Sequence, residues 1–107
     1  MTNFNDRERG EEAKSAHDEE MHFRIHARRN RLLGQWAAER MGLSSAEAES
    51  YAKGVVQADF EEAGDEDVVR KVLGDLISAG VEASEADIRA ALTAREIEAR
   101  RMLMGEG

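Results

Sequence analysis

Two histidines four residues apart are the side chains in this sequence whose types and spacing most directly suggest chemistry. His22 and His26 would share one face of a helix, where two imidazoles can bind one metal ion, and Asp18 lies one turn earlier as a third ligand. A metallohydrolase of this pattern needs a glutamate beside the first histidine as a base, but position 23 is phenylalanine. The pattern therefore favours a solvated helix surface, and we expect no metal and no required cofactor.

A cluster of arginines follows directly. Residues 21–31 contain Arg24, Arg28, Arg29 and Arg31 and no acidic residue, whereas residues 1–20 contain three basic and seven acidic residues. One interpretation is a solvated face on which Glu20 pairs with Arg24 at i,i+4 spacing. The other is contact with an acidic partner, or docking against residues 32–107, which contain eight basic and 16 acidic residues.

Asp59 is the remaining candidate for acid–base chemistry, because it falls on the apolar stripe of a predicted helix. A partly buried carboxylate needs a hydrogen-bonding or ionic partner. The sequence has no second candidate base, no Ser/His/Asp arrangement and no glycine-rich phosphate loop beside it. We therefore predict a structural role at a seam between helices, and no enzyme activity.

Phe4 is an aromatic residue in an otherwise polar and acidic segment, 1–20. Rigid aromatic side chains supply much of the binding energy at protein interfaces. The segment has pairs of opposite charge one helical turn apart, but it has no apolar stripe of its own to bury. It is typical of a segment that becomes an ordered helix when a partner supplies the burial.

The elements that must position these residues are helices. The chain has 107 residues with no proline, 17 alanines and 36% charged residues, which favours an all-α fold. Only three of the 20 Leu, Ile, Val and Phe residues fall within residues 1–31. We therefore predict a small four-helix bundle with a flexible or partly helical N-terminal arm: 1–20 as the arm, 21–104 as the four-helix domain and 105–107 as a frayed C-terminus.

Local signals mark three of the helices. Ser44-x-x-Glu47 and Ser84-x-x-Asp87 are capping boxes, and Asp65 is expected to cap the helix between them. The stripes that we expect to be buried on the last two helices include Ile77 and Met102. The mid-helix glycines are predicted to mark close approaches between helices, and they are Gly34, Gly54 and Gly74.

Charge and cysteine content exclude several function classes. The formal net charge of −8 disfavours nucleic-acid binding, which requires a basic surface. The absence of cysteine excludes a disulfide framework and a thiol nucleophile. No apolar run approaches the ~18 residues of a membrane span, so we expect a cytoplasmic protein without direct membrane insertion.

Three runs, FNDRERGEEAKSAHDEE, ARRNRLLGQWAAERMG and VVQADFEEAGDEDVVRKV, resemble the ζ subunit family of α-proteobacterial F-type ATP synthases. The resemblance spans nearly the whole chain. It implies a regulatory subunit that inhibits ATP hydrolysis, with an N-terminal arm that enters a catalytic α/β interface and blocks rotation in the hydrolytic direction. It also implies an arm whose contact residues are Phe4, Asp6, Arg7, Glu8, Arg9, Glu12, Ala13, Lys14 and His17.

The implied partner is the catalytic head of the synthase, with its α, β and γ subunits, reached at the cytoplasmic face of the inner membrane. The resemblance further implies weak adenine-nucleotide binding, although the sequence has no phosphate-cradling loop and its acidic surface disfavours a nucleotide. We expect the free protein to be monomeric. The arginine cluster is then a secondary partner contact. The alternative is an all-helical adaptor or a homodimeric protein-binding module of an unrelated pathway.

Overall fold

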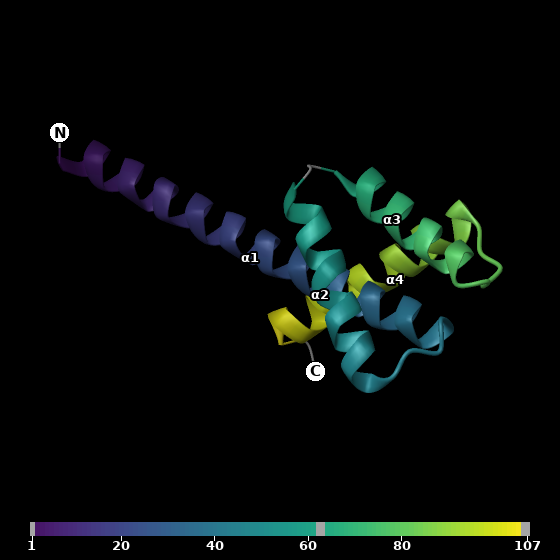
Figure 1. Ribbon diagram of the computed structural model, residues 1–107. Helices are drawn as coiled ribbons and strands as arrows, with labels where there is room; N and C mark the ends of the chain where they lie inside the picture. Colours follow the sequence, from purple (N-terminus) through teal and green to yellow (C-terminus); the bar gives the residue numbers. More distant parts are fainter. Residues whose placement is uncertain (1, 62–63, 106–107) are drawn as a thin grey trace.

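Four α-helices make up this computed structural model, which describes residues 2–61 and 64–105, and the side chains of 19–59 and 64–105. The helices are α1 (Thr2–Arg40), α2 (Ser45–Glu61), α3 (Asp65–Ser78) and α4 (Glu85–Met104). Short connections join them into a bundle (Figure 1). The predicted all-α, four-helix fold is confirmed. None of the described helices combines the length and apolar character needed to cross a membrane.

The first helix is much longer than the others and belongs only in part to the bundle. It has 39 residues, and the first of its described side chains to be buried is Ile25. Figure 1 shows the N-terminal half of α1 projecting away from the other helices, which gives the molecule extents of 65 × 30 × 24 Å. The predicted arm, residues 1–20, therefore continues without a break into the first helix of the bundle from Thr2 onward.

The core is formed where all four helices meet. Its buried members are Leu33, Ala37, Val55, Val68, Val69, Val72, Leu76, Ile88, Ala91 and Leu92. Two residues of the predicted stripes are not buried, since Ile77 is 58% exposed and Met102 is 50% exposed. Ile77 follows the buried Leu76, and Met102 precedes the half-buried Leu103. A step of one residue turns the side chain by about 100° around a helix. The neighbouring helices therefore do not cover the faces of α3 and α4 on which Ile77 and Met102 lie.

Helix starts agree with the sequence at two of three places. The Ser44–Glu47 and Ser84–Asp87 capping boxes are both present. In each, the serine hydroxyl accepts a hydrogen bond from the backbone N–H of the residue three positions later. The predicted cap at Asp65 is wrong. The cap position is Gly64, without a side-chain cap, and the Asp65 carboxylate instead accepts a hydrogen bond from Arg29. A charge-assisted hydrogen bond to a buried guanidinium is stronger than a cap bond that the carboxylate would accept from a backbone N–H at the exposed helix start.

Only one of the three mid-helix glycines marks a close approach. A Cβ added at Gly34 would lie 2.6 Å from the Cα of Ala52, so α1 and α2 touch through their backbones there. A Cβ added at Gly54 or at Gly74 would meet nothing within 4 Å, so the prediction is wrong for these two positions. The contact at Gly34 sets the separation of the two helices that position the arm.

Replacing Gly34 by alanine should lower the free energy of unfolding by about 1–3 kcal/mol, because the new methyl group must push α1 and α2 apart. Gly74→Ala is the matched control and should raise it by ~0.5–1 kcal/mol, since an open helical site gains from alanine. Urea denaturation measures both. A Gly34→Ala protein as stable as the Gly74→Ala protein would contradict the close packing of α1 on α2.

Candidate partner-binding surface

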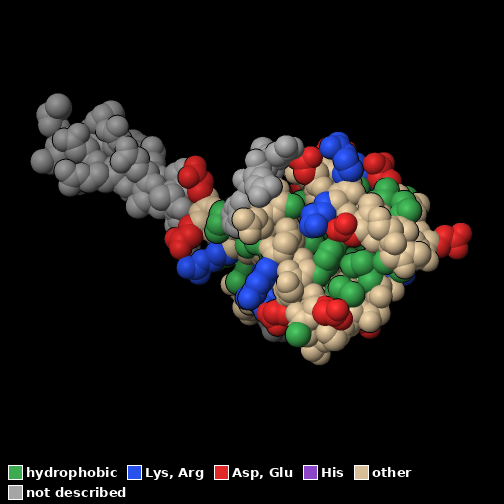
Figure 2. Space-filling model, viewed as in Figure 1, with side chains coloured by type: hydrophobic (Ala, Val, Ile, Leu, Met, Phe, Trp, Pro, Cys, Tyr) green, Lys and Arg blue, Asp and Glu red, His purple; other side chains and the backbone are tan. Residues whose placement is uncertain are grey.

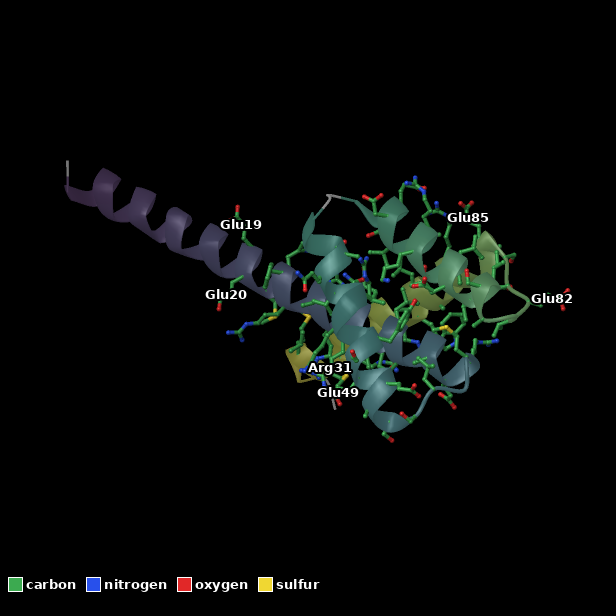
Figure 3. The ribbon with its side chains drawn as sticks, viewed as in Figure 1. Glu19, Glu20, Arg31, Glu49, Glu82 and Glu85 are labelled. Atoms are coloured by element: carbon green, nitrogen blue, oxygen red, sulfur yellow. The ribbon has the colours of Figure 1, made fainter. Side chains whose placement is uncertain are left out.

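The predicted contact residues of the arm lie on the projecting half of α1. Their backbone is helical, and their side chains are outside those that the structure describes. These residues are Phe4, Asp6, Arg7, Glu8, Arg9, Glu12, Ala13, Lys14 and His17. At the base of the arm, Glu19 and Glu20 are both exposed, and they point away from α1 on different sides (Figure 3). At residues 19 and 20, α1 is therefore still solvated before it enters the bundle.

The four arginines of the cluster have four different environments. Arg24 pairs with Glu20 at 2.9 Å on the exposed surface, which is the i,i+4 pair that the sequence predicts. Arg31 of α1 donates to Glu49 of α2 at 2.6 Å, and the two side chains lie together in Figure 3. Arg28 is half-buried, and no residue among those described forms an ion pair with it.

Arg29 is docked against the rest of the chain, which is the intramolecular one of the two interpretations of the arginine cluster. Its side chain is 2% exposed, and its guanidinium donates to Asp65 of α3 at 2.9 Å and to Glu96 of α4 at 3.3 Å. Its Nε also donates to the buried Asn30 at 3.1 Å. Three helices are therefore joined at one buried charge, and Arg29 is not accessible to a partner while the bundle is closed.

The two histidines lie side by side where α1 meets α2. Their ring centroids are 4.5 Å apart and their planes are inclined by 37°. Partial burial lowers the pKa of His26, and the charges of Arg29 and His22 lower it further, against the opposing effect of Asp59 and Asp65. The His26 imidazole is therefore held more readily in its neutral form, which avoids repulsion in a crowded, basic neighbourhood.

The surroundings of the histidine pair mix polar side chains with the apolar Phe23, Ala27 and Val56. Glu19, Asp59 and the buried Asn30 line the same shallow depression, and the Asn30 Nδ2 has no hydrogen-bond partner among the side chains and backbone that the structure describes. In the part of the chain that is described, no three His, Cys, Asp or Glu side chains converge as metal ligands would. The Asp18 side chain, the third ligand weighed from the sequence, is outside the described residues. Asp59 lies at the seam between α1 and α2, where its negative charge acts on His26.

A second depression, of about 510 Å³, lies at the root of the arm and is called the arm-root groove below. It brings one face of α1 together with α2 and α4, and its lining is Phe23, Arg24, Ala27, Arg28 and Arg31 of α1, Lys53 and Val56 of α2, and Leu103 of α4. Figure 2 shows Lys or Arg side chains beside Asp or Glu side chains where α1 enters the bundle. The sequence pointed to the arginines of this groove but not to Lys53, Val56 or Leu103, because they come from other helices.

Comparison with known proteins covers almost the whole chain. Residues 1–102 match the model of the family described as ATPase inhibitor subunit zeta. A chain whose solution NMR structure is known is 50% identical, and the match covers 81% of this chain and 99% of that chain with a TM-score of 0.70. A search of curated protein sequences found no match.

Proposed function

Because the chain belongs to the ATPase inhibitor subunit zeta family, we propose that it inhibits ATP hydrolysis by inserting its N-terminal arm into the catalytic head of an F-type ATP synthase. The arm enters a catalytic interface between an α and a β subunit and blocks rotation in the hydrolytic direction. The bundle stays outside, in contact with the head at the cytoplasmic face of the inner membrane. The protein itself is regulatory and performs no reaction.

The observation that carries this proposal is the shape of α1. The helix is continuous from Thr2 to Arg40, but its described buried residues begin only at Ile25. Residues 2–20 therefore extend about 28 Å beyond the bundle, at 1.5 Å per helical residue. A single helix is about 10–12 Å wide, whereas the whole molecule measures 30 × 24 Å across its long axis. An opening just wide enough for the single helix of the arm is therefore too narrow for the bundle, which stays outside.

Inhibition then follows from differential affinity. A catalytic interface passes through open and closed states during turnover, and a ligand shifts such an equilibrium only if it binds one state more tightly. A helix wedged between the two subunits contacts both of them in one state only. The arm holds that state and halts the cycle without chemistry of its own.

The proposed contacts of the arm combine one aromatic anchor with charged side chains. Phe4 is the anchor, because burying a rigid aromatic ring yields much free energy for little loss of rotamer freedom. The charged residues fix the register of the helix against both subunits. In this proposal they are Asp6, Arg7, Glu8, Arg9, Glu12, Lys14 and His17, with Ala13 allowing close approach.

Breaking α1 between the arm and the bundle tests the proposal. Ala16→Pro removes a backbone hydrogen bond and bends the helix, at a cost of about 3 kcal/mol. Arm and bundle can then no longer keep their relative position, so we expect the concentration for half-maximal inhibition of the isolated head to rise at least about tenfold. This cost falls on the arm alone, which can unwind near position 16 without disturbing the bundle. The melting temperature should therefore hardly change, because position 16 precedes every buried residue of α1 described above.

Thr2→Pro is the matched control, since proline is tolerated at the first position of a helix. It should inhibit like the wild type. If Ala16→Pro inhibited equally well, the arm would not act as a continuation of α1. If the wild-type protein left hydrolysis by the head unchanged, the proposed function would be wrong.

A further inference from the structure

We propose that the arm-root groove binds an acidic, amphipathic helix on the outer surface of the catalytic head, and that this second contact holds the bundle in place while the arm is inserted. This inference rests on the proposed function. It assigns a role to a surface that lies outside the arm and that is built from three helices.

The charge of the groove is the first argument. The chain as a whole has a net charge of −8, yet four basic side chains line this one depression. Within the described residues, Arg28 and Lys53 form no ion pair, so no described carboxylate neutralises their charges. Arg24 and Arg31 pair with exposed glutamates, and such surface pairs are exchanged at little cost. The groove therefore attracts an acidic segment, whereas the net negative charge of the rest of the protein repels it.

The floor of the groove is the second argument. Val56 and Leu103 are half-buried, and Phe23 is 53% exposed at its edge. Apolar surface at the centre with charge around it is the usual composition of a protein interface. An occupant needs apolar side chains on the face that enters the groove, flanked by carboxylates.

The spacing of the basic residues indicates a helix as the occupant. Arg24, Arg28 and Arg31 follow one another at i, i+4 and i+7 on one face of α1. Carboxylates on a helix lying along α1 recur at the same spacing, so several pairs form together. The volume of about 510 Å³ holds a few side chains of one such element.

The position of the groove fits simultaneous binding of arm and bundle. Phe23 and Arg24 begin it one helical turn after the arm ends at residue 20. The occupant must therefore lie beside the mouth of the interface that the arm enters. Two contacts on one rigid helix bind more tightly than either alone, because the second forms at a high effective concentration.

The first test reverses the charges of Arg28 and Lys53 in the full-length protein. Arg28→Glu/Lys53→Glu should raise the concentration for half-maximal inhibition of the isolated head at least about tenfold. The matched control is Arg70→Glu/Arg101→Glu, which changes the net charge equally at two exposed arginines outside the groove. The control should change inhibition less than about threefold, an effect of overall charge that salt screens.

Both double variants should keep the helix content and melting temperature of the wild type, because the four side chains lie at or near the surface. The charge-conserving variant Arg28→Lys/Lys53→Arg should inhibit like the wild type. Equal inhibition by the two charge-reversed proteins would overturn the groove proposal while leaving the inserted arm intact. Failure of the wild type to inhibit would instead contradict the proposed function.

The second test identifies the occupant. The chain has no cysteine, so Lys53→Cys creates a unique site for a photocrosslinker at the edge of the groove. In the complex with the head, we expect the crosslink in a helix of the α, β or γ subunit that carries several carboxylates. A crosslink to a segment without acidic residues, or no crosslink at saturating head, would overturn the proposal. So would protection of the Lys53→Cys thiol by ATP alone, which would show a small anion in the groove.

Discussion

Replacing Asp65 by asparagine and Glu96 by glutamine in one variant should lower the free energy of unfolding by about 3–5 kcal/mol. The two carboxylates are the ionic partners of Arg29, whose side chain is 2% exposed. A guanidinium cannot lose its proton in the protein, so the variant must bury an unpaired charge. Since a small domain is stable by only about 5–15 kcal/mol, the loss is a large part of the total.

Three further variants separate this buried charge from simple loss of contacts. Each single substitution should cost less, because the second carboxylate remains at 2.9 or 3.3 Å. Adding Arg29→Met to the double variant should restore most of the stability, since a buried ion pair can be replaced by apolar side chains with little loss. Urea denaturation measures the whole series. A triple variant no more stable than the double variant would contradict the account of Arg29 as a buried, paired charge.

Features determined by neighbours in the chain could be predicted from the sequence. The two capping boxes depend on residues three apart, and the Arg24–Glu20 pair on residues four apart. All three are present. The absence of proline and the unequal distribution of large apolar residues likewise predicted four helices with a polar N-terminal extension.

Features determined across the bundle could not be predicted in the same way. Asp65 has the sequence context of a helix cap, but Arg29 lies 36 residues away and binds its carboxylate instead. Gly34 and Gly74 both lie in helix interiors, and they are distinguished by Ala52 and Val55 of α2, which lie against Gly34 but not against Gly74. The exposure of Ile77 and Met102 depends equally on which faces of α3 and α4 the other helices cover.

One signal in the sequence could have identified Arg29 as buried. It lies four residues after Ile25 and four before Leu33, both of which are buried, so helical periodicity places it on the inward face. Arg28 lies about 100° away on the groove side. The arginine cluster therefore serves two purposes, with Arg29 holding the bundle together and Arg28 facing the groove.

Deletion of residues 1–18 should abolish inhibition and leave the bundle almost as stable as before. The deleted residues include only Phe4 among the 20 Leu, Ile, Val and Phe side chains, and every core residue of the bundle comes later in the chain. The variant should therefore lose inhibition but keep its stability. Thermal unfolding followed by circular dichroism measures the stability, and the melting temperature should shift by no more than a few degrees, corresponding to about 1 kcal/mol or less.

The matched control removes residues 105–107 at the other end of the chain, beyond the last turn of α4. This deletion should change neither inhibition nor stability. A truncated arm variant that failed to fold would contradict the separation of arm and bundle. Loss of inhibition in the C-terminal control would show that removing either end of the chain disturbs the complex with the head. That result would contradict an inhibitory element confined to the arm.

The most direct test of the inserted arm is steady-state ATP hydrolysis by the isolated catalytic head, titrated with the full-length protein and with the protein lacking residues 1–18. We expect the full-length protein to inhibit in a saturable manner. The truncated protein should leave the rate unchanged at every concentration, although its bundle is folded and retains the arm-root groove. Equal inhibition by the two proteins would place the inhibitory surface on the bundle and contradict insertion of the arm.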